Sequence, residues 1–318
     1  MFPRIVFMGS PNFAVPILQR LAEQYNVVGV VTQPDRPAGR GRTLTAPPVK
    51  ELAVKLGIPF IQPQRLSEPS AMSQLEQWRP DLIVVAAFGQ ILKPPVLNLP
   101  PYGCVNVHAS LLPRWRGAAP IPYAILHGDQ ETGITIMKMD EGVDTGPILS
   151  QRAVPILDTD NTLSLTIRLA EIAAELLPET LADYLTGKLT PREQDHKQAT
   201  YAPMLKKEQG ELDFSQSAVS LWRKVRAFYP WPSAFTFLNG KHLIIHEALP
   251  IAFEHEYPVG QTLCFQKKAA VATAEGLLEL VKVQPSGKKP ISGPDLINGY
   301  REWGRIVLPH WEESTRSG

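Results

Sequence analysis

Cysteine is scarce in this chain of 318 residues, which holds only Cys104 and Cys264. Both lie among apolar neighbours and far apart in sequence, which indicates buried free thiols of a reducing compartment and argues against a disulfide framework. Apolar runs of the roughly 20 residues needed to cross a bilayer are also missing. The N-terminus has no charged-then-apolar signal pattern. We therefore expect a cytoplasmic protein with no membrane segment.

An excess of charge of one sign is missing too, because 32 Lys and Arg against 31 Asp and Glu leave a formal net charge of +1. No global field draws the protein to nucleic acid, so any such binding must depend on local basic patches. Groups of Cys and His with metal-ligand spacing are absent. His242 and His246 lie four residues apart, but in a strand-like stretch rather than a helix, and we expect no metal.

The first half of the chain alternates apolar strands with helical segments. A strand at 5–8, a helix at 13–24 and a strand at 27–32 form a βαβ opening, which predicts a parallel sheet. The clearest central strand is 81–89, which is continuously apolar and rich in β-branched residues. A dinucleotide site is rejected, because Gly9 stands alone where the fingerprint needs three spaced glycines.

The length of the chain predicts two domains. Residues 1–187 form the expected α/β domain. Near its end, Pro178 predicts that the helical stretch 162–185 is broken or kinked, which gives two helical pieces. Residues 188–209 are polar and aperiodic, which is typical of a linker. Residues 210–318 hold short strands joined by turns, which predicts a small β-barrel of the OB-fold type.

Asn106 and His108 lie two residues apart at the end of a predicted buried strand, so their side chains point to the same side. An amide beside an imidazole is suited to polarising a carbonyl and moving a proton. A capped strand end with a satisfied histidine is the alternative. Asp144 follows a further predicted strand, and α/β sheets place their sites in the loops after parallel strands.

Three arginines, Arg36, Arg40 and Arg42, lie in the stretch 33–43, which is punctuated by Gly and Pro. The stretch is too long and irregular for the usual βα turn of about 2–6 residues, which favours a functional insertion. A solvated flexible loop is the alternative.

The segments NVHASLLPRWRGAAP at 106–120 and DEGVDTG at 140–146 resemble the formyltetrahydrofolate-dependent formyltransferase family. The resemblance covers nearly the whole chain. The opening FMGSPNFA, the arginine loop and the segments FYPWP at 228–232 and QPSGKK at 284–289 narrow it to the branch that acts on tRNA.

The resemblance implies formyl transfer from 10-formyltetrahydrofolate to the amino group of methionyl-initiator tRNA, in translation initiation. Asn106, His108 and Asp144 are the implied catalytic residues. Asn106 would donate a hydrogen bond to the formyl oxygen, and His108 would donate there or shuttle a proton. Asp144 would pair with His108, fix its tautomer or accept the amine proton, and the sequence leaves these roles open.

The resemblance also implies where the formyl donor binds. Ser110, Leu111, Leu112 and Pro113 match the folate-binding segment, whose backbone would meet the pterin edge. The residues expected to line the same pocket are Phe88, Gly89 and Ile91, for which core packing is the alternative. A sharp turn at the strand end predicts a cis Leu112–Pro113 bond.

Basic residues are the implied contacts to tRNA: Arg36, Arg40 and Arg42 at its acceptor end, and Lys206, Lys207, Lys288 and Lys289 on its phosphates. One chain carries both the site and this surface, so we expect a monomer. Three alternatives remain: a formyltransferase acting on an amino sugar nucleotide, a formyl-folate hydrolase and a non-catalytic RNA-binding protein.

Overall fold

The computed structural model describes residues 3–38 and 43–309. The chain divides into two compact units, the first formed by most of the chain up to Ala202 and the second by 121–130, 156–164 and the residues from Pro203 on. In the described part of the chain, no helix is both long and apolar enough to span a membrane.

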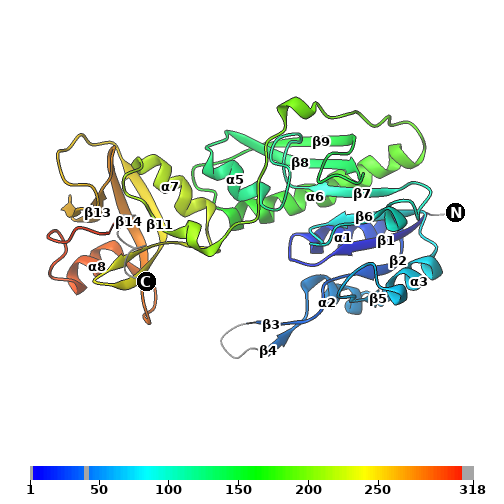
Figure 1. The fold of residues 1–318 in the computed structure, drawn as a ribbon, viewed down its shortest axis with the longest axis horizontal. Helices are drawn as coiled ribbons and strands as arrows, with labels where there is room; N and C mark the ends of the chain where they lie inside the picture. Colours follow the sequence, from blue (N-terminus) through cyan, green and yellow to red (C-terminus); the bar gives the residue numbers. More distant parts are fainter. Residues whose placement is uncertain (1–2, 39–42, 310–318) are drawn as a thin grey trace. The chain divides into compact units, whose positions relative to one another are not determined.

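A seven-stranded sheet organises the first unit, with the strand order β5-β2-β1-β6-β7-β8-β9 (Figure 1). Its strands are β1 (Arg4–Gly9), β2 (Asn26–Val31), β5 (Phe60–Ile61), β6 (Leu82–Ala86), β7 (Cys104–His108), β8 (Glu131–Lys138) and β9 (Ile148–Pro155). The five strands from β5 to β7 are parallel, as predicted. β8 and β9 run antiparallel, so the sheet is mixed. β9 runs antiparallel to β8 because the connection between them is short and holds no helix, whereas a parallel pair needs a crossover of about a dozen residues or more.

Helices complete the α/β architecture: α1 (Ala14–Gln24), α2 (Pro48–Lys55), α3 (Pro69–Trp78), α4 (Pro94–Leu97) and α6 (Thr162–Leu185). The helix α5 (Pro120–Leu126) lies almost wholly in the segment 121–130, which belongs to the second unit. β6 is buried along its whole length, as its apolar run predicts. Leu75 of α3 and Val96 of α4 pack with Ile83 and Val85 of β6 in one core cluster. The prediction of a break at Pro178 is wrong, because α6 runs through it. Pro178 is itself among the buried residues of that helix.

A two-stranded hairpin replaces the irregular insertion expected near the arginines (Figure 1). β3 (Arg36–Ala38) pairs antiparallel with β4 (Thr43–Thr45), and Arg36 lies opposite Thr45. Arg40 and Arg42 lie outside the described residues.

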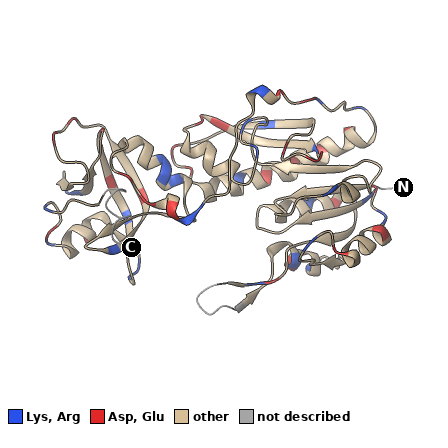
Figure 2. Ribbon diagram, in the orientation of Figure 1, with Lys and Arg blue, Asp and Glu red and all other residues tan. Residues whose placement is uncertain are grey.

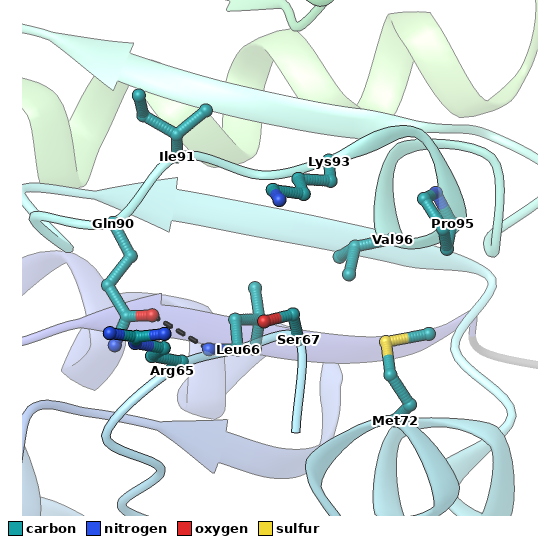
Figure 3. A pocket seen from close by; sticks show the side chains of 9 residues that line it. All are labelled: Arg65, Leu66, Ser67, Met72, Gln90, Ile91, Lys93, Pro95 and Val96. Atoms are coloured by element: carbon teal, nitrogen blue, oxygen red, sulfur yellow. Dashed lines mark hydrogen bonds between the residues drawn. The ribbon is translucent and has the colours of Figure 1, made fainter. Parts of the chain in front are cut away.

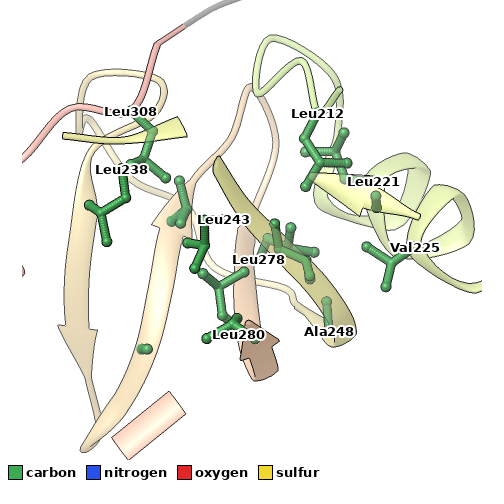
Figure 4. Close-up of a cluster of buried hydrophobic side chains, with 14 of the residues drawn as sticks. Leu212, Leu221, Val225, Leu238, Leu243, Ala248, Leu278, Leu280 and Leu308 are labelled. Carbon is green, nitrogen blue, oxygen red and sulfur yellow. The ribbon is translucent and has the colours of Figure 1, made fainter. Parts of the chain in front are cut away.

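The second unit is built on an antiparallel sheet in the order β10-β11-β14-β13-β12, with β15 paired to β14. Its elements are α7 (Ala218–Ala227), β10 (Ala234–Leu238), β11 (Lys241–Ile251), β12 (Thr262–Phe265), β13 (Lys268–Ala272), β14 (Leu277–Pro285), β15 (Ile291–Ser292) and α8 (Gly293–Gly299). Asn239 and Gly240 form the predicted two-residue hairpin turn, both with positive φ. Leu221 and Val225 of α7 share the unit's apolar core with Leu278 of β14 (Figure 4). The OB-type barrel stays a prediction.

The two cysteines have different environments. Cys104 is buried on β7, as expected, and desolvation raises the pKa of its thiol to about 12. Cys264 is exposed, so the expectation of two buried thiols is wrong for it. β12 lies at the end of the strand order, and Cys264 points away from the core there although its neighbours are apolar.

Candidate active site

Asn106, His108 and Asp144 lie together on one face of β7. Asn106 Nδ2 donates a hydrogen bond to Asp144 Oδ1 over 3.2 Å. His108 Nδ1 lies 3.6 Å from the same oxygen. His108 is buried, and the Asp144 side chain is 14% exposed. The i, i+2 spacing on the strand therefore presents the amide and the imidazole to one carboxylate.

The orientation of the His108 ring fixes which of its nitrogens faces the carboxylate. His108 Nε2 lies 2.9 Å from the carbonyl oxygen of Trp115. A carbonyl only accepts hydrogen bonds, so Nε2 carries a proton in both the neutral and the charged ring. Nδ1 is therefore the nitrogen that gains and loses a proton, and it faces Asp144.

Asp144 reaches this position from the hairpin connection between β8 and β9. Its Oδ2 accepts a 2.8 Å hydrogen bond from the backbone N–H of Gly117. Its backbone has φ +54°, a left-handed conformation that Asp tolerates better than most residues. The expectation that all three groups follow parallel strands is wrong for Asp144, because β8 is antiparallel to β7. The connection between β8 and β9, here called the hairpin tip, folds back so that Asp144 completes a triad with Asn106 and His108.

Glycine permits this close return of the chain. A Cβ added to Gly146 would lie 2.0 Å from the carbonyl oxygen of Lys138. No side chain fits at that distance, so the hairpin tip can approach the end of β8 only with glycine here.

A buried arginine lies behind the hairpin tip. Arg116 is 2% exposed and donates from Nε and Nη2 to Gln194 Oε1, over 3.2 and 2.7 Å. Gln194 Nε2 donates to the carbonyl oxygens of Asp144 and Gly146, over 3.0 and 2.7 Å. The sequence does not predict a role for Gln194, which lies in the predicted linker 188–209.

That stretch also bonds to the loop after β7. The backbone N–H groups of Thr200 and Ala202 donate to the carbonyl oxygens of Pro113 and Arg116. Backbone hydrogen bonds of this kind do not depend on the side chain, so the sequence carries no sign of them. Gln194 is the residue whose side chain could have indicated that this segment belongs to the site. The predicted boundaries at 187 and 210 stay a prediction.

The segment Ser110–Pro113 forms a tightly bonded turn. Thr135 Oγ1 donates to the carbonyl oxygen of Ser110 and accepts from the N–H of Leu112, and the carbonyl oxygen of Leu112 accepts from Gln151. The side chain of Leu112 is buried with Met137 and Ile148. Several backbone groups expected to meet a pterin therefore already bond within the protein. The Leu112–Pro113 peptide is cis, as predicted.

The three residues predicted after β6 differ in their surroundings. Phe88 packs in the core cluster, so its side chain follows the core-packing alternative. Gly89 is exposed with positive φ, and Ile91 is 75% exposed. In Figure 3, Gln90 turns to Leu66, to which it is hydrogen-bonded, whereas Ile91 points the other way. Of the three predicted residues, Ile91 lines a pocket of about 410 Å³, together with Gln90, Arg65 and Lys93.

Basic residues are spread over both units and interspersed with acidic ones (Figure 2). Arg36 is exposed and donates from Nη2 to Gln33 Oε1, and Gln33 Nε2 donates to the carbonyl oxygen of Phe88. The stem of the arginine hairpin is therefore bonded to the loop after β6.

In the second unit, the four predicted lysines are all exposed: Lys206, Lys207, Lys288 and Lys289. α7 carries three further cations that the sequence reasoning did not single out (Figure 2). Two of them serve the fold. Lys224 donates to the carbonyl oxygen of Glu211, and burial lowers the pKa of its ammonium. Arg226 donates to the carbonyl oxygens of Asp160 and Leu157.

The triad can hold an anionic oxygen and exchange a proton. Asn106 uses one amide hydrogen on Asp144 and keeps a second for a ligand oxygen. Among the described residues, no group of three or more His, Cys, Asp or Glu side chains is arranged to hold a metal ion. The geometry therefore fits acyl-type transfer to a nucleophile by hydrogen bonding and proton movement.

Two family models match this chain. The model described as formyl transferase matches residues 3–181, and the one described as formyl transferase, C-terminal domain, matches residues 204–301. A methionyl-tRNA formyltransferase of Myxococcus xanthus is 49% identical over 300 residues, 94% of this chain and 96% of that protein. A methionyl-tRNA formyltransferase of Bacillus subtilis is 46% identical over 299 residues, covering 93% and 94%.

Solved structures show the same fold at lower identity. WlaRD, a sugar 3N-formyl transferase solved with dTDP and 5-N-formyl-THF, has a TM-score of 0.67 at 17% identity, covering 91% of this chain and 100% of that one. HypX from Aquifex aeolicus, in complex with tetrahydrofolic acid, has a TM-score of 0.61 at 17% identity, covering 97% and 50%.

Proposed function

This chain belongs to the formyl transferase family, and we propose on that premise that it transfers the formyl group of 10-formyltetrahydrofolate to the amino group of methionyl-initiator tRNA. The observation that carries the proposal is the convergence of Asn106 Nδ2 and His108 Nδ1 on one oxygen of Asp144, at 3.2 and 3.6 Å.

Each side chain of the triad has a task in this reaction. As the amine attacks the formyl carbon, negative charge grows on the formyl oxygen, and the free amide hydrogen of Asn106 would bind it. Donors of this kind contribute about 3 kcal/mol each. His108 would take up the amine proton at Nδ1, because Nε2 is bonded to Trp115.

The proton that leaves the amine passes through His108 to the leaving folate nitrogen, beside the Asp144 carboxylate. The new carbon–nitrogen bond forms on the amine as the bond to the folate nitrogen breaks, and that nitrogen receives a proton from His108 Nδ1. Asp144 would stabilise the charged ring while it holds the proton.

The formyl donor supplies only the one-carbon unit, and the protein would hold it between two segments. Gly89 and Ile91 offer exposed groups after β6, and Ser110–Pro113 form the turn after β7. Phe88 would contribute through its backbone. Ile91 is 75% exposed, so its side chain is accessible to a ligand at this place.

The basic residues would hold the tRNA. Arg36, at the described base of the arginine hairpin, supports placing the acceptor end there together with Arg40 and Arg42. Charge reversal in Arg42→Glu should raise KM for tRNA and leave the folate Kd unchanged. If the variant instead lost folate binding, the arginine hairpin would belong to the binding site of the formyl donor.

Residues 1–187 would form the catalytic domain and 210–318 the tRNA-binding domain, joined by 188–209. Sequence-independent phosphate contacts would come from the four exposed lysines, Lys206, Lys207, Lys288 and Lys289. Because charged initiator tRNA is made and used in the cytoplasm, we propose that location. We also propose a monomer, which light scattering in solution tests.

One assay distinguishes this function from its alternatives. The protein is given 10-formyltetrahydrofolate with charged initiator tRNA, with an amino sugar nucleotide, or with no acceptor. Formylation of the tRNA alone supports the proposal, whereas consumption without acceptor indicates a hydrolase. His108→Ala should bind tRNA normally and lose most turnover, and near-wild-type turnover would reject the catalytic assignment.

A further inference from the structure

Arg116 is a buried cation with neutral partners. Its guanidinium bonds to the Gln194 amide and, from Nη2, to His196 Nδ1 over 3.0 Å. A buried charge is costly unless hydrogen bonds compensate it, so strong bonds to these neutral acceptors are favoured. The most direct of them runs to Gln194, which receives two of the guanidinium donors.

These two bonds settle which way the Gln194 amide points. Arginine has donors only, so the atom that faces it must be the amide oxygen. The amide nitrogen then faces the carbonyl oxygens of Asp144 and Gly146, to which its two hydrogens are donated. Polarisation by the guanidinium strengthens the amide as a donor on that side.

The Asp144 carbonyl belongs to the peptide unit that directly follows the Asp144 Cα, and the Gly146 carbonyl lies two peptide units further on, so the two bonds hold the backbone just after Asp144. Asp144 has the left-handed φ of +54°, which is sustained only where surrounding bonds hold it. A rotation of these peptide units would move the carboxylate away from Asn106 Nδ2 and His108 Nδ1.

We propose that Gln194, oriented by Arg116, is a positioning residue that sets the Asp144 carboxylate against Asn106 and His108. The inference rests on the proposed function, because it gives Gln194 a task in the same transfer. Misplacement of a catalytic group by about 1 Å can cost roughly 100-fold in rate, so the effect is measurable.

The decisive variant is Gln194→Glu. Glutamate keeps an acceptor for Arg116, and so keeps the buried cation paired, but it removes both hydrogens from the Asp144 and Gly146 carbonyls. We expect kcat to fall about 100-fold, with KM for folate and for tRNA each within threefold of wild type. Gln198→Glu is the matched control, since it makes the same change at an exposed residue of the same segment. Its kcat should stay within twofold.

A double-mutant cycle tests whether Gln194 acts through Asp144. In single-turnover assays with excess enzyme, Gln194→Glu should slow Asp144→Asn by less than threefold, because the carboxylate that it positions is already gone. A further 100-fold loss in the double variant would overturn the proposal, as would a wild-type kcat in Gln194→Glu.

Arg116→Lys keeps the test open if Gln194→Glu does not fold. Lysine retains the charge but not the planar pair of donors, so Gln194 loses its fixed orientation and kcat should again fall with KM unchanged. A rise in KM with kcat unchanged would contradict the proposal that Gln194 positions Asp144. Inactivity of the wild-type protein itself would instead reject the proposed function.

Discussion

Replacing Asp144 with asparagine tests the charge of the triad with little change of shape. In the native site, one carboxylate oxygen faces Asn106 Nδ2 and His108 Nδ1 while the other accepts from Gly117. Asparagine has a single oxygen for these partners. If that oxygen keeps the Gly117 bond, its NH₂ group donates to His108 Nδ1 and blocks the nitrogen that would take up the amine proton.

The size of the effect follows from the distance. Two unit charges 3.6 Å apart attract by about 4–5 kcal/mol at an effective dielectric constant of about 20, which is an upper bound on what the carboxylate adds to a transition state with positive charge at that distance. Some of this is recovered by rearrangement, since the asparagine dipole and solvent partly replace the carboxylate. At 1.36 kcal/mol for each factor of ten, we expect the rate to fall between about 100- and 1,000-fold.

Single-turnover formylation of methionyl-tRNA, followed by separating formylated from free aminoacyl-tRNA, measures this rate directly. KM for both substrates should change little, because Asp144 bonds to protein groups. Glu141→Gln is the control, as it removes the same charge from an exposed residue of the same hairpin tip. A loss below tenfold in Asp144→Asn, or an equal loss in Glu141→Gln, would refute the electrostatic reasoning.

Three further predictions concern stability and reactivity. Leu280→Ala opens the core of the second unit and should lower its free energy of unfolding by about 2–5 kcal/mol in urea melts. A thiol-specific reagent at pH 7 should label Cys264 in the native protein and Cys104 only after denaturation, because burial raises the pKa of Cys104 to about 12. The hydrogen bond from Gln62 lowers the pKa of Asp35, so its unfolded form binds protons first as the pH falls. The free energy of unfolding of the wild type should therefore exceed that of Asp35→Asn by its largest amount near pH 6, and this difference should shrink below about pH 4.

Local pattern was enough to predict much of the fold. The apolar run of β6 predicts a buried parallel strand, and Asn239-Gly240 predicts a two-residue hairpin turn; both are found. Periodicity failed where tertiary packing overrides a local rule. Pro178 is accommodated inside α6, in a buried position where the packed helix outweighs one lost backbone hydrogen bond.

The mixed sheet shows a different limit. Nothing in the apolar pattern of β8 distinguishes a parallel from an antiparallel partner, because side chains alternate in both cases. The direction of β9 depends on the connection that carries Asp144. The sequence therefore predicted three side chains that the structure brings together, but not the path that brings Asp144 to the other two.

The role of Gln194 could not be predicted from single residues of the sequence. Its partners on the hairpin tip are carbonyl oxygens of Asp144 and Gly146, which every residue type supplies, so no motif links them to residue 194. Arg116 gives a chemical reason for an acceptor at residue 194, since a buried guanidinium is costly unless its donors are hydrogen-bonded. A carboxylate would satisfy the arginine better but would repel both carbonyls. The amide is the side chain that bonds to both, so a polar residue in an apparent linker can be part of the site.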